Sequence, residues 1–163
     1  MDLPELERQY YKGLTYELSN LFTNDYDDSY VLGTDAETRV IYDIGLYFSV
    51  EHFSESEADV LRYAFEVDTD PLNAVHDNYI LKRKESLYQT IHSVKKELPK
   101  SVRYPGFVQV IHGDNYSESY STTYFTATLE VEGSYFVFQM IGKRENMGYL
   151  YDDFIALLSS VNS

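Results

Sequence analysis

Cysteine and tryptophan are absent from this chain of 163 residues. Without cysteine, disulfides and thiolate chemistry are excluded. No run approaches about 18 consecutive apolar residues, so no transmembrane helix is expected. The first residues contain neither a basic stretch nor an apolar one, so we expect no cleaved signal peptide and a cytoplasmic location.

Basic residues are also scarce. The chain has 13 lysines and arginines against 27 aspartates and glutamates, a formal net charge of −14. Such a surface repels phosphates and anionic lipids, so direct binding to nucleic acid or to a membrane is not expected.

The charge is unevenly distributed along the chain. Residues 1–80 hold 18 acids and 4 bases, residues 81–110 hold 2 acids and 7 bases, and residues 111–163 hold 7 acids and 2 bases. The basic segment is expected either to form a solvated face or to meet acidic segments of a second copy in a homo-oligomer.

Hydrophobic residues make up 44% of the chain and aromatic residues 16%, including 17 tyrosines. This composition supports a real core, and the length suits a single domain over 1–163.

Apolar residues recur at helical spacing in most of the chain. Capping boxes at Thr34–Glu37 and Ser54–Glu57, and an Asp70-Pro71 pair, mark helix starts. Asn146 is available to cap a final helix. The expected helices are 3–22, 34–52, 55–65, 70–75, 78–98 and 150–161. The pattern therefore predicts a mainly α fold, with helical hairpins in a compact bundle.

Residues 105–142 carry a competing signal. Apolar and polar residues alternate from Phe125 to Glu132, and an aromatic run follows Gly133, as in a β-hairpin. The alternative is therefore an α+β fold with N-terminal helices, a C-terminal antiparallel β-meander at 105–142 and a final helix. However, aligning 45–53 with 133–141 keeps Gly, Tyr and Phe in register. A possible internal repeat of 34–66 and 121–161 would favour helix in both copies.

Several segments resemble, in order, the TerB-like helical proteins of Gram-positive bacteria. They are 47–61, 68–75, 98–101 with 107–108, and 133–158. The resemblance implies a helical bundle with an accessory role. The family's Ala-Asp-Gly turn, whose acid is thought to help hold a metal, is replaced by 49–51 and 137–139. The resemblance therefore implies no metal site.

No catalytic motif stands out in the sequence. There is no nucleophile elbow and no glycine-rich phosphate loop, so we expect no enzyme activity and no cofactor. One alternative is a metal-binding stress-response protein, since carboxylates and an imidazole can hold a divalent cation. Its ligands would be Glu51, His52, Glu55 and Glu57.

Tyrosines lie beside acids in two turn-rich segments. Tyrosine is enriched at protein interfaces, and neighbouring carboxylates favour a basic partner. The candidate partner-binding residues are Asp25, Tyr26, Asp27, Asp28, Tyr30, Asp114, Tyr116, Glu118 and Tyr120. The sequence thus predicts a non-catalytic, acidic protein-interaction module of bacterial or phage type that binds a basic protein. A further alternative is an inhibitor, immunity protein or nucleic-acid mimic that blocks a toxin or nuclease.

Overall fold

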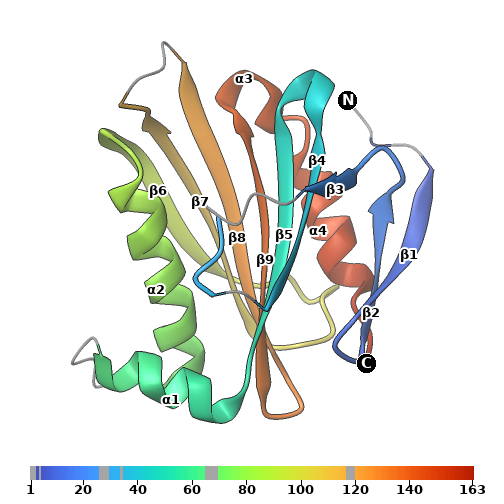
Figure 1. The fold of residues 1–163 in the computed structure, drawn as a ribbon, viewed down its shortest axis with the longest axis vertical. Coiled ribbons are helices and arrows are strands. Elements are labelled where there is room, and N and C mark those ends of the chain that lie inside the picture. The colour runs from blue at the N-terminus through green and yellow to red at the C-terminus, as the bar shows by residue number, and fades with distance from the viewer. Residues whose placement is uncertain (1–2, 4, 26–29, 34, 65–69, 117–119) are drawn as a thin grey trace.

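The computed structural model describes residues 3, 5–25, 30–33, 35–64, 70–116 and 120–163. Its centre is an antiparallel seven-stranded sheet in the order β3-β4-β5-β9-β8-β7-β6, beside a separate β1-β2 hairpin (Figure 1). The strands are β1 Leu6–Tyr11, β2 Leu14–Ser19, β3 Thr23–Asp25, β4 Ala36–Ile41, β5 Leu46–Phe53, β6 Gln89–Glu97, β7 Gly106–Asp114, β8 Ser121–Val131 and β9 Ser134–Lys143. The helices are η1 Tyr42–Ile44, α1 Glu55–Ala64, α2 Pro71–Glu85, α3 Arg144–Met147 and α4 Tyr151–Ser160.

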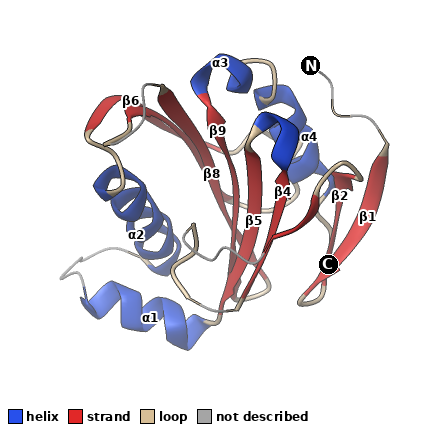
Figure 2. Cartoon of the chain, turned by 45° about the horizontal axis from the view of Figure 1, so that its top comes forward, coloured by secondary structure: helices blue, strands red, loops and turns tan. Residues whose placement is uncertain are grey.

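The sheet is covered on both faces (Figures 1 and 2). Helices α1 and α2 lie on one face, and the β1-β2 hairpin and α4 lie on the other. Along β9, Phe136 and Phe138 join the core under the hairpin and α4, while Tyr135 and Val137 join the core under α1 and α2. Burial on both faces explains why 135–141 is apolar apart from Gln139, because a central strand needs apolar residues on both sides.

The prediction of a mainly α bundle is wrong, because the fold is α+β and dominated by its sheet. Strands β7, β8 and β9 occupy the range where the alternative placed a meander, and α1 and α2 are among its N-terminal helices, but the helices expected over 3–22 and 34–52 are strands. The segments aligned as a repeat, 45–53 and 133–141, contain β5 and β9, which pair as antiparallel neighbours. Their shared residues therefore do not indicate helix.

The expected helix over 3–22 is instead the β1-β2 hairpin. Lys12 and Gly13 form its turn with φ of 49° and 84°, positive values that suit a tight hairpin turn. In β2, Leu14, Tyr16 and Leu18 are buried on one face. Their spacing of two is a strand period, which the leucine pattern of this segment concealed.

Two other helix predictions are also wrong. Residues 36–53 form β4, η1 and β5, and Gly45 takes the left-handed conformation at the end of η1. Thr34, the expected cap, lies outside the described residues. The expected helix over 78–98 is divided between α2, which ends at Glu85, and β6.

Two helix starts are confirmed by their capping hydrogen bonds. The Ser54 N–H donates to Glu57 Oε1 at 3.1 Å, and the Glu57 N–H donates to Ser54 Oγ at 3.2 Å, which completes the capping box of α1. The Asn73 N–H donates to Asp70 Oδ1 at 2.9 Å, and Pro71 opens α2. The final helix is present as α4, although its N-cap is Leu150 rather than Asn146. Within the described part of the chain, no helix has the length and apolar character needed to span a membrane.

Candidate interaction surface

One end of the sheet collects the termini of six strands. Ile41 at the end of β4 pairs with Leu46 at the start of β5. Thr122 near the start of β8 pairs with Lys143 at the end of β9, and Gln89 at the start of β6 pairs with Asp114 at the end of β7. The connections at this end therefore lie next to one another although they are far apart in sequence.

These connections carry exposed tyrosines. Five exposed tyrosines lie in the segments that connect the strands at this end: Tyr42 in η1, Tyr88 before β6, Tyr116 after β7, Tyr120 before β8 and Tyr149 after α3. Four are 69–71% exposed and Tyr120 is 37% exposed. We call these five residues the tyrosine end. Among the other described tyrosines, only Tyr10 and Tyr63 are comparably exposed.

Three of the five rings of the tyrosine end, those of Tyr88, Tyr116 and Tyr120, make specific contacts. Tyr88 and Tyr116 meet edge to face with ring centroids 5.6 Å apart, and the Tyr88 N–H donates to the Asp114 carbonyl at 2.8 Å. Lys143 Nζ lies 4.8 Å from the centroid of the Tyr120 ring. These contacts reduce the number of rotamers that a partner would have to fix on binding.

Two hollows flank these rings. An open cleft of about 440 Å³ is lined by Tyr120, Ser121, Lys143, Arg144 and Glu145. A mostly apolar cleft of about 370 Å³ beside η1 is lined by Leu3, Leu21, Thr23, Val40, Ile41, Tyr42, Asp43 and Ile44. The surface thus offers concave sites, apolar contact area and charged groups of both signs.

The structure brings only part of the predicted site together. Asp114, Tyr116 and Tyr120 lie at the tyrosine end, whereas Asp25 ends β3, which is the strand at the opposite edge of the sheet from β6. Tyr26, Asp27, Asp28 and Glu118 lie outside the described residues.

Tyr30 is not a surface residue of this kind. Its ring lies 5.0 Å from that of Tyr47, and the buried Arg83 guanidinium lies 5.7 Å from its centroid. The Tyr30 carbonyl accepts a hydrogen bond from Gln139 Nε2 at 2.7 Å. The Tyr30 side chain therefore packs between the sheet and α2.

Tyr42, Tyr88 and Tyr149 were missed by sequence reasoning. Tyr42 precedes Asp43, and Tyr149 lies three residues before Asp152, so both had an acid nearby in sequence. Tyr88 had no such signal, because 78–98 was expected to be one helix. Its position depends on the break between α2 and β6.

The residues of the metal hypothesis do not converge. Glu51 and His52 are consecutive in β5, so their side chains point to opposite faces of the sheet. Glu51 is buried and accepts the N–H groups of Leu32 and Gly33 at 2.9 and 2.8 Å. His52 instead lies against the Phe136 ring on the other face. Within the described ranges, no three potential ligands gather as a metal site.

Glu51 has a structural role. Its carboxylate also accepts a hydrogen bond from the Tyr79 hydroxyl of α2, so it links β5, the segment 30–33 and α2. Burial raises the pKa of this carboxyl, while the two backbone N–H groups lower it. Glu51 is thus buried, and its carboxylate accepts hydrogen bonds from three donors within the fold.

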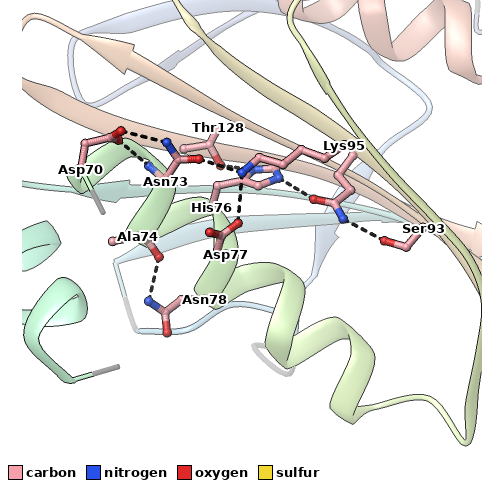
Figure 3. Close-up of polar contacts among 10 residues, drawn as sticks. Asp70, Asn73, Ala74, His76, Asp77, Asn78, Ser93, Lys95 and Thr128 are labelled. Atoms are coloured by element: carbon pink, nitrogen blue, oxygen red, sulfur yellow. Dashed lines mark hydrogen bonds and ion pairs between the residues drawn. The ribbon is translucent and has the colours of Figure 1, made fainter. Parts of the chain in front are cut away.

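His76 forms a second buried polar network, on α2 (Figure 3). Nε2 lies 2.9 Å from Gln109 Oε1, and Nδ1 lies 2.9 Å from Thr128 Oγ1. Because Gln109 Nε2 donates to Ser93 Oγ at 2.8 Å, its Oε1 accepts from the imidazole. Nε2 therefore carries a proton, and because burial lowers the pKa of His76 to about 4, the ring is neutral at pH 7. Fully enclosed, it fixes α2 on β7 and β8 and has no access to a substrate.

Acidification is expected to destabilise the protein through His76. Burial lowers its pKa to about 4, the Gln109 hydrogen bond and Asp77 oppose this, and Lys95 adds to it. Because the unfolded imidazole titrates near 6.5, the unfolded state binds more protons between about pH 4 and 6.5. Stability is then lost as pH falls through this window, by about 2 kcal/mol between pH 7 and pH 5.

The free energy of unfolding is measured with urea for the native chain and for His76→Gln, at pH 7 and at pH 5. The difference between the two proteins isolates the contribution of His76. The native chain should lose about 2 kcal/mol more than the variant between pH 7 and pH 5. Equal losses in the two proteins would show that His76 does not titrate on unfolding.

Comparison with known proteins identifies the fold. No family model and no curated protein matches the chain. Among solved structures, the Saccharomyces cerevisiae Ran-binding protein Mog1p is 8% identical, over 97% of this chain and 96% of that one, with a TM-score of 0.54. A mutant of the protein Mog1 is 9% identical, over 96% of this chain and 87% of that one, with the same TM-score. At these identities the likeness shows the fold alone. It replaces the TerB-like resemblance, because that family's helical bundle is not the fold of this chain.

Proposed function

We propose that this protein is a non-catalytic protein-interaction module that contacts its partner through the tyrosine end. The observation that carries the proposal is the convergence of five exposed tyrosines on one end of the sheet. Tyrosine supplies a large amphipathic contact area at little entropic cost, and it is enriched at the centres of protein interfaces. A single exposed tyrosine needs no such explanation.

Two further observations support a binding role. The buried polar groups Glu51 and His76 are satisfied within the fold, so neither is positioned to act on a substrate. The solved structure of similar fold from yeast is described as a Ran-binding protein, which shows that in that protein the scaffold serves protein recognition. The fold likeness assigns no partner to this chain.

We further propose that the partner is a basic protein. The net charge of −14 attracts a cationic protein at long range and accelerates encounter. Asp43 in η1, Asp114 at the end of β7 and Glu145 in α3 are acids at the tyrosine end itself. Lys143 and Arg144, also at this end, would face acids of the partner and so fix its orientation.

Alanine replacement of Tyr88 and Tyr116 together tests the proposal. The tagged native chain and Y88A/Y116A are used to capture proteins from the source cell, and the captured protein is then purified and titrated. Binding to the double variant should weaken by about 30-fold or more, because interface tyrosines act as hot spots. Binding should also weaken as salt rises, since the charges are solvent-exposed.

The double variant Tyr10→Ala with Tyr63→Ala is the matched control. It removes two tyrosines of similar exposure, on β1 and α1, away from the tyrosine end. Its affinity should stay within about threefold of the native value. Equal weakening by both double variants, or full binding by Y88A/Y116A, would refute the tyrosine end as the contact surface.

A further inference from the structure

We propose that the free edge of β6 binds an acidic, extended polypeptide segment, which joins the sheet as an additional strand. This surface differs from the tyrosine end in position and in chemistry. It uses backbone groups and lysines along the side of the sheet, and it goes beyond the proposed function because it names a second ligand class.

The edge itself is the first observation. β6 is the last strand of the sheet, and among the described residues β7 is its only strand neighbour (Figures 1 and 2). It is nine residues long, whereas β3 at the opposite edge has three residues. A long edge strand presents a row of unpaired N–H and C=O groups, which an extended peptide satisfies by β-augmentation.

The charge of this edge is the second observation. The basic segment 81–110 contributes the lysines of β6, and Lys95 and Lys96 are consecutive and exposed. Lys95 lies on the α2 face, with its Nζ 2.7 Å from Asn73 Oδ1 and 3.2 Å from Asp77 Oδ1 (Figure 3). The same Nζ lies 4.3 Å from the Phe107 ring centroid. Lys96 is the next residue of the strand, so it lies on the other face.

This arrangement specifies a pattern in the ligand. Successive side chains of an added strand also alternate between the two faces. Two consecutive acids in the ligand therefore place one carboxylate next to each lysine. Opposite charges across neighbouring strands stabilise pairing, and like charges oppose it.

The same lysines disfavour pairing between two β6 strands. Registers that place lysine opposite lysine would bring like charges together, and the irregular register between Thr90 and His92 interrupts a continuous ladder. Such features protect an edge against self-association. They do not exclude an acidic strand, and Ile91, 48% exposed, offers such a strand an apolar contact in the other half of β6.

NMR titration of the full-length chain with a designed peptide tests the inference. The probe is a capped nine-residue peptide of threonine and valine with a central Glu-Glu pair. One comparison peptide carries Lys-Lys instead, and another carries two prolines, which cannot donate backbone hydrogen bonds. The Glu-Glu peptide should shift the amide signals of β6 and slow their hydrogen exchange, and the other two should bind at least about tenfold more weakly.

Variants of the protein separate charge from structure. Lys96→Glu makes no change to the Lys95 contacts and should weaken binding of the Glu-Glu peptide by about fivefold or more. Lys100→Glu, in the β6-β7 connection, changes the net charge equally off the strand and should have little effect. The proposal would be overturned if the three peptides bound equally well, or if the signal shifts were confined to other strands. It would also be overturned if the β6 signals shifted with protein concentration in the absence of peptide. The last result would instead indicate a second copy at this edge.

Discussion

Replacing Phe138 by alanine is expected to lower the free energy of unfolding by about 3–5 kcal/mol. Phe138 is fully buried in β9, at the centre of the core between the sheet and the β1-β2 hairpin. Its ring meets that of Tyr16 edge to face at 5.3 Å and lies 6.3 Å from that of Phe48. Truncation removes the free energy gained when the ring is buried away from water. It also leaves a cavity that the rigid neighbouring strands cannot close.

Urea unfolding at pH 7 measures this loss as a shift of the midpoint at constant slope. Tyr63→Ala is the control, because its side chain is 73% exposed on α1 and its removal should change stability by no more than about 0.5 kcal/mol. A loss below about 1.5 kcal/mol for Phe138→Ala would mean that this core is not tightly packed.

Replacing Gly106 by alanine is expected to cost about 3 kcal/mol or more. Gly106 starts β7 and pairs with Leu129 of β8. A β carbon at this position would lie 1.8 Å from the Thr128 carbonyl oxygen and 3.0 Å from Leu98 Cδ1. Because the clashing atom belongs to the backbone of a central strand, relief requires β7 and β8 to separate locally.

Gly148→Ala provides the comparison. Gly148 has a φ of −59°, and a β carbon there meets no atom within 4 Å, so its replacement should be nearly neutral. The two variants differ only in position, and their urea midpoints give the difference directly. Similar stabilities of the two variants would show that the backbone of β8 does not lie close against Gly106.

The helix starts were predictable because their causes are local. Ser54 with Glu57, and Asp70 with Asn73, form hydrogen bonds within four residues, so the sequence contains both partners of each cap. The body of a helix is less certain from sequence. In 3–22, leucines spaced by three or four residues also alternate within β2, and packing against the sheet and α4 decided in favour of strands.

The tyrosine end was only partly predictable from the sequence, because local composition does not determine where a side chain lies in the fold. Tyr116 and Tyr120 were identified from their acidic, turn-rich surroundings, and they do lie at the tyrosine end. Tyr30 came from a similar segment but packs inward on Arg83. Local composition indicates that a segment is a turn, but it does not indicate which way the side chains of that turn point.

By itself, the sequence determined the net charge, its division into acidic and basic segments, the absence of thiol chemistry and two capped helix starts. The first three follow from counting residues of each type, and the helix starts depend on hydrogen bonds between residues close together in the sequence. The tertiary structure decided that Tyr42, Tyr88 and Tyr149 join Tyr116 and Tyr120 at one end, and that β6 is left as an edge. Both depend on the pairing of strands far apart in the chain, which is set by burial on both faces of the sheet and not by local pattern.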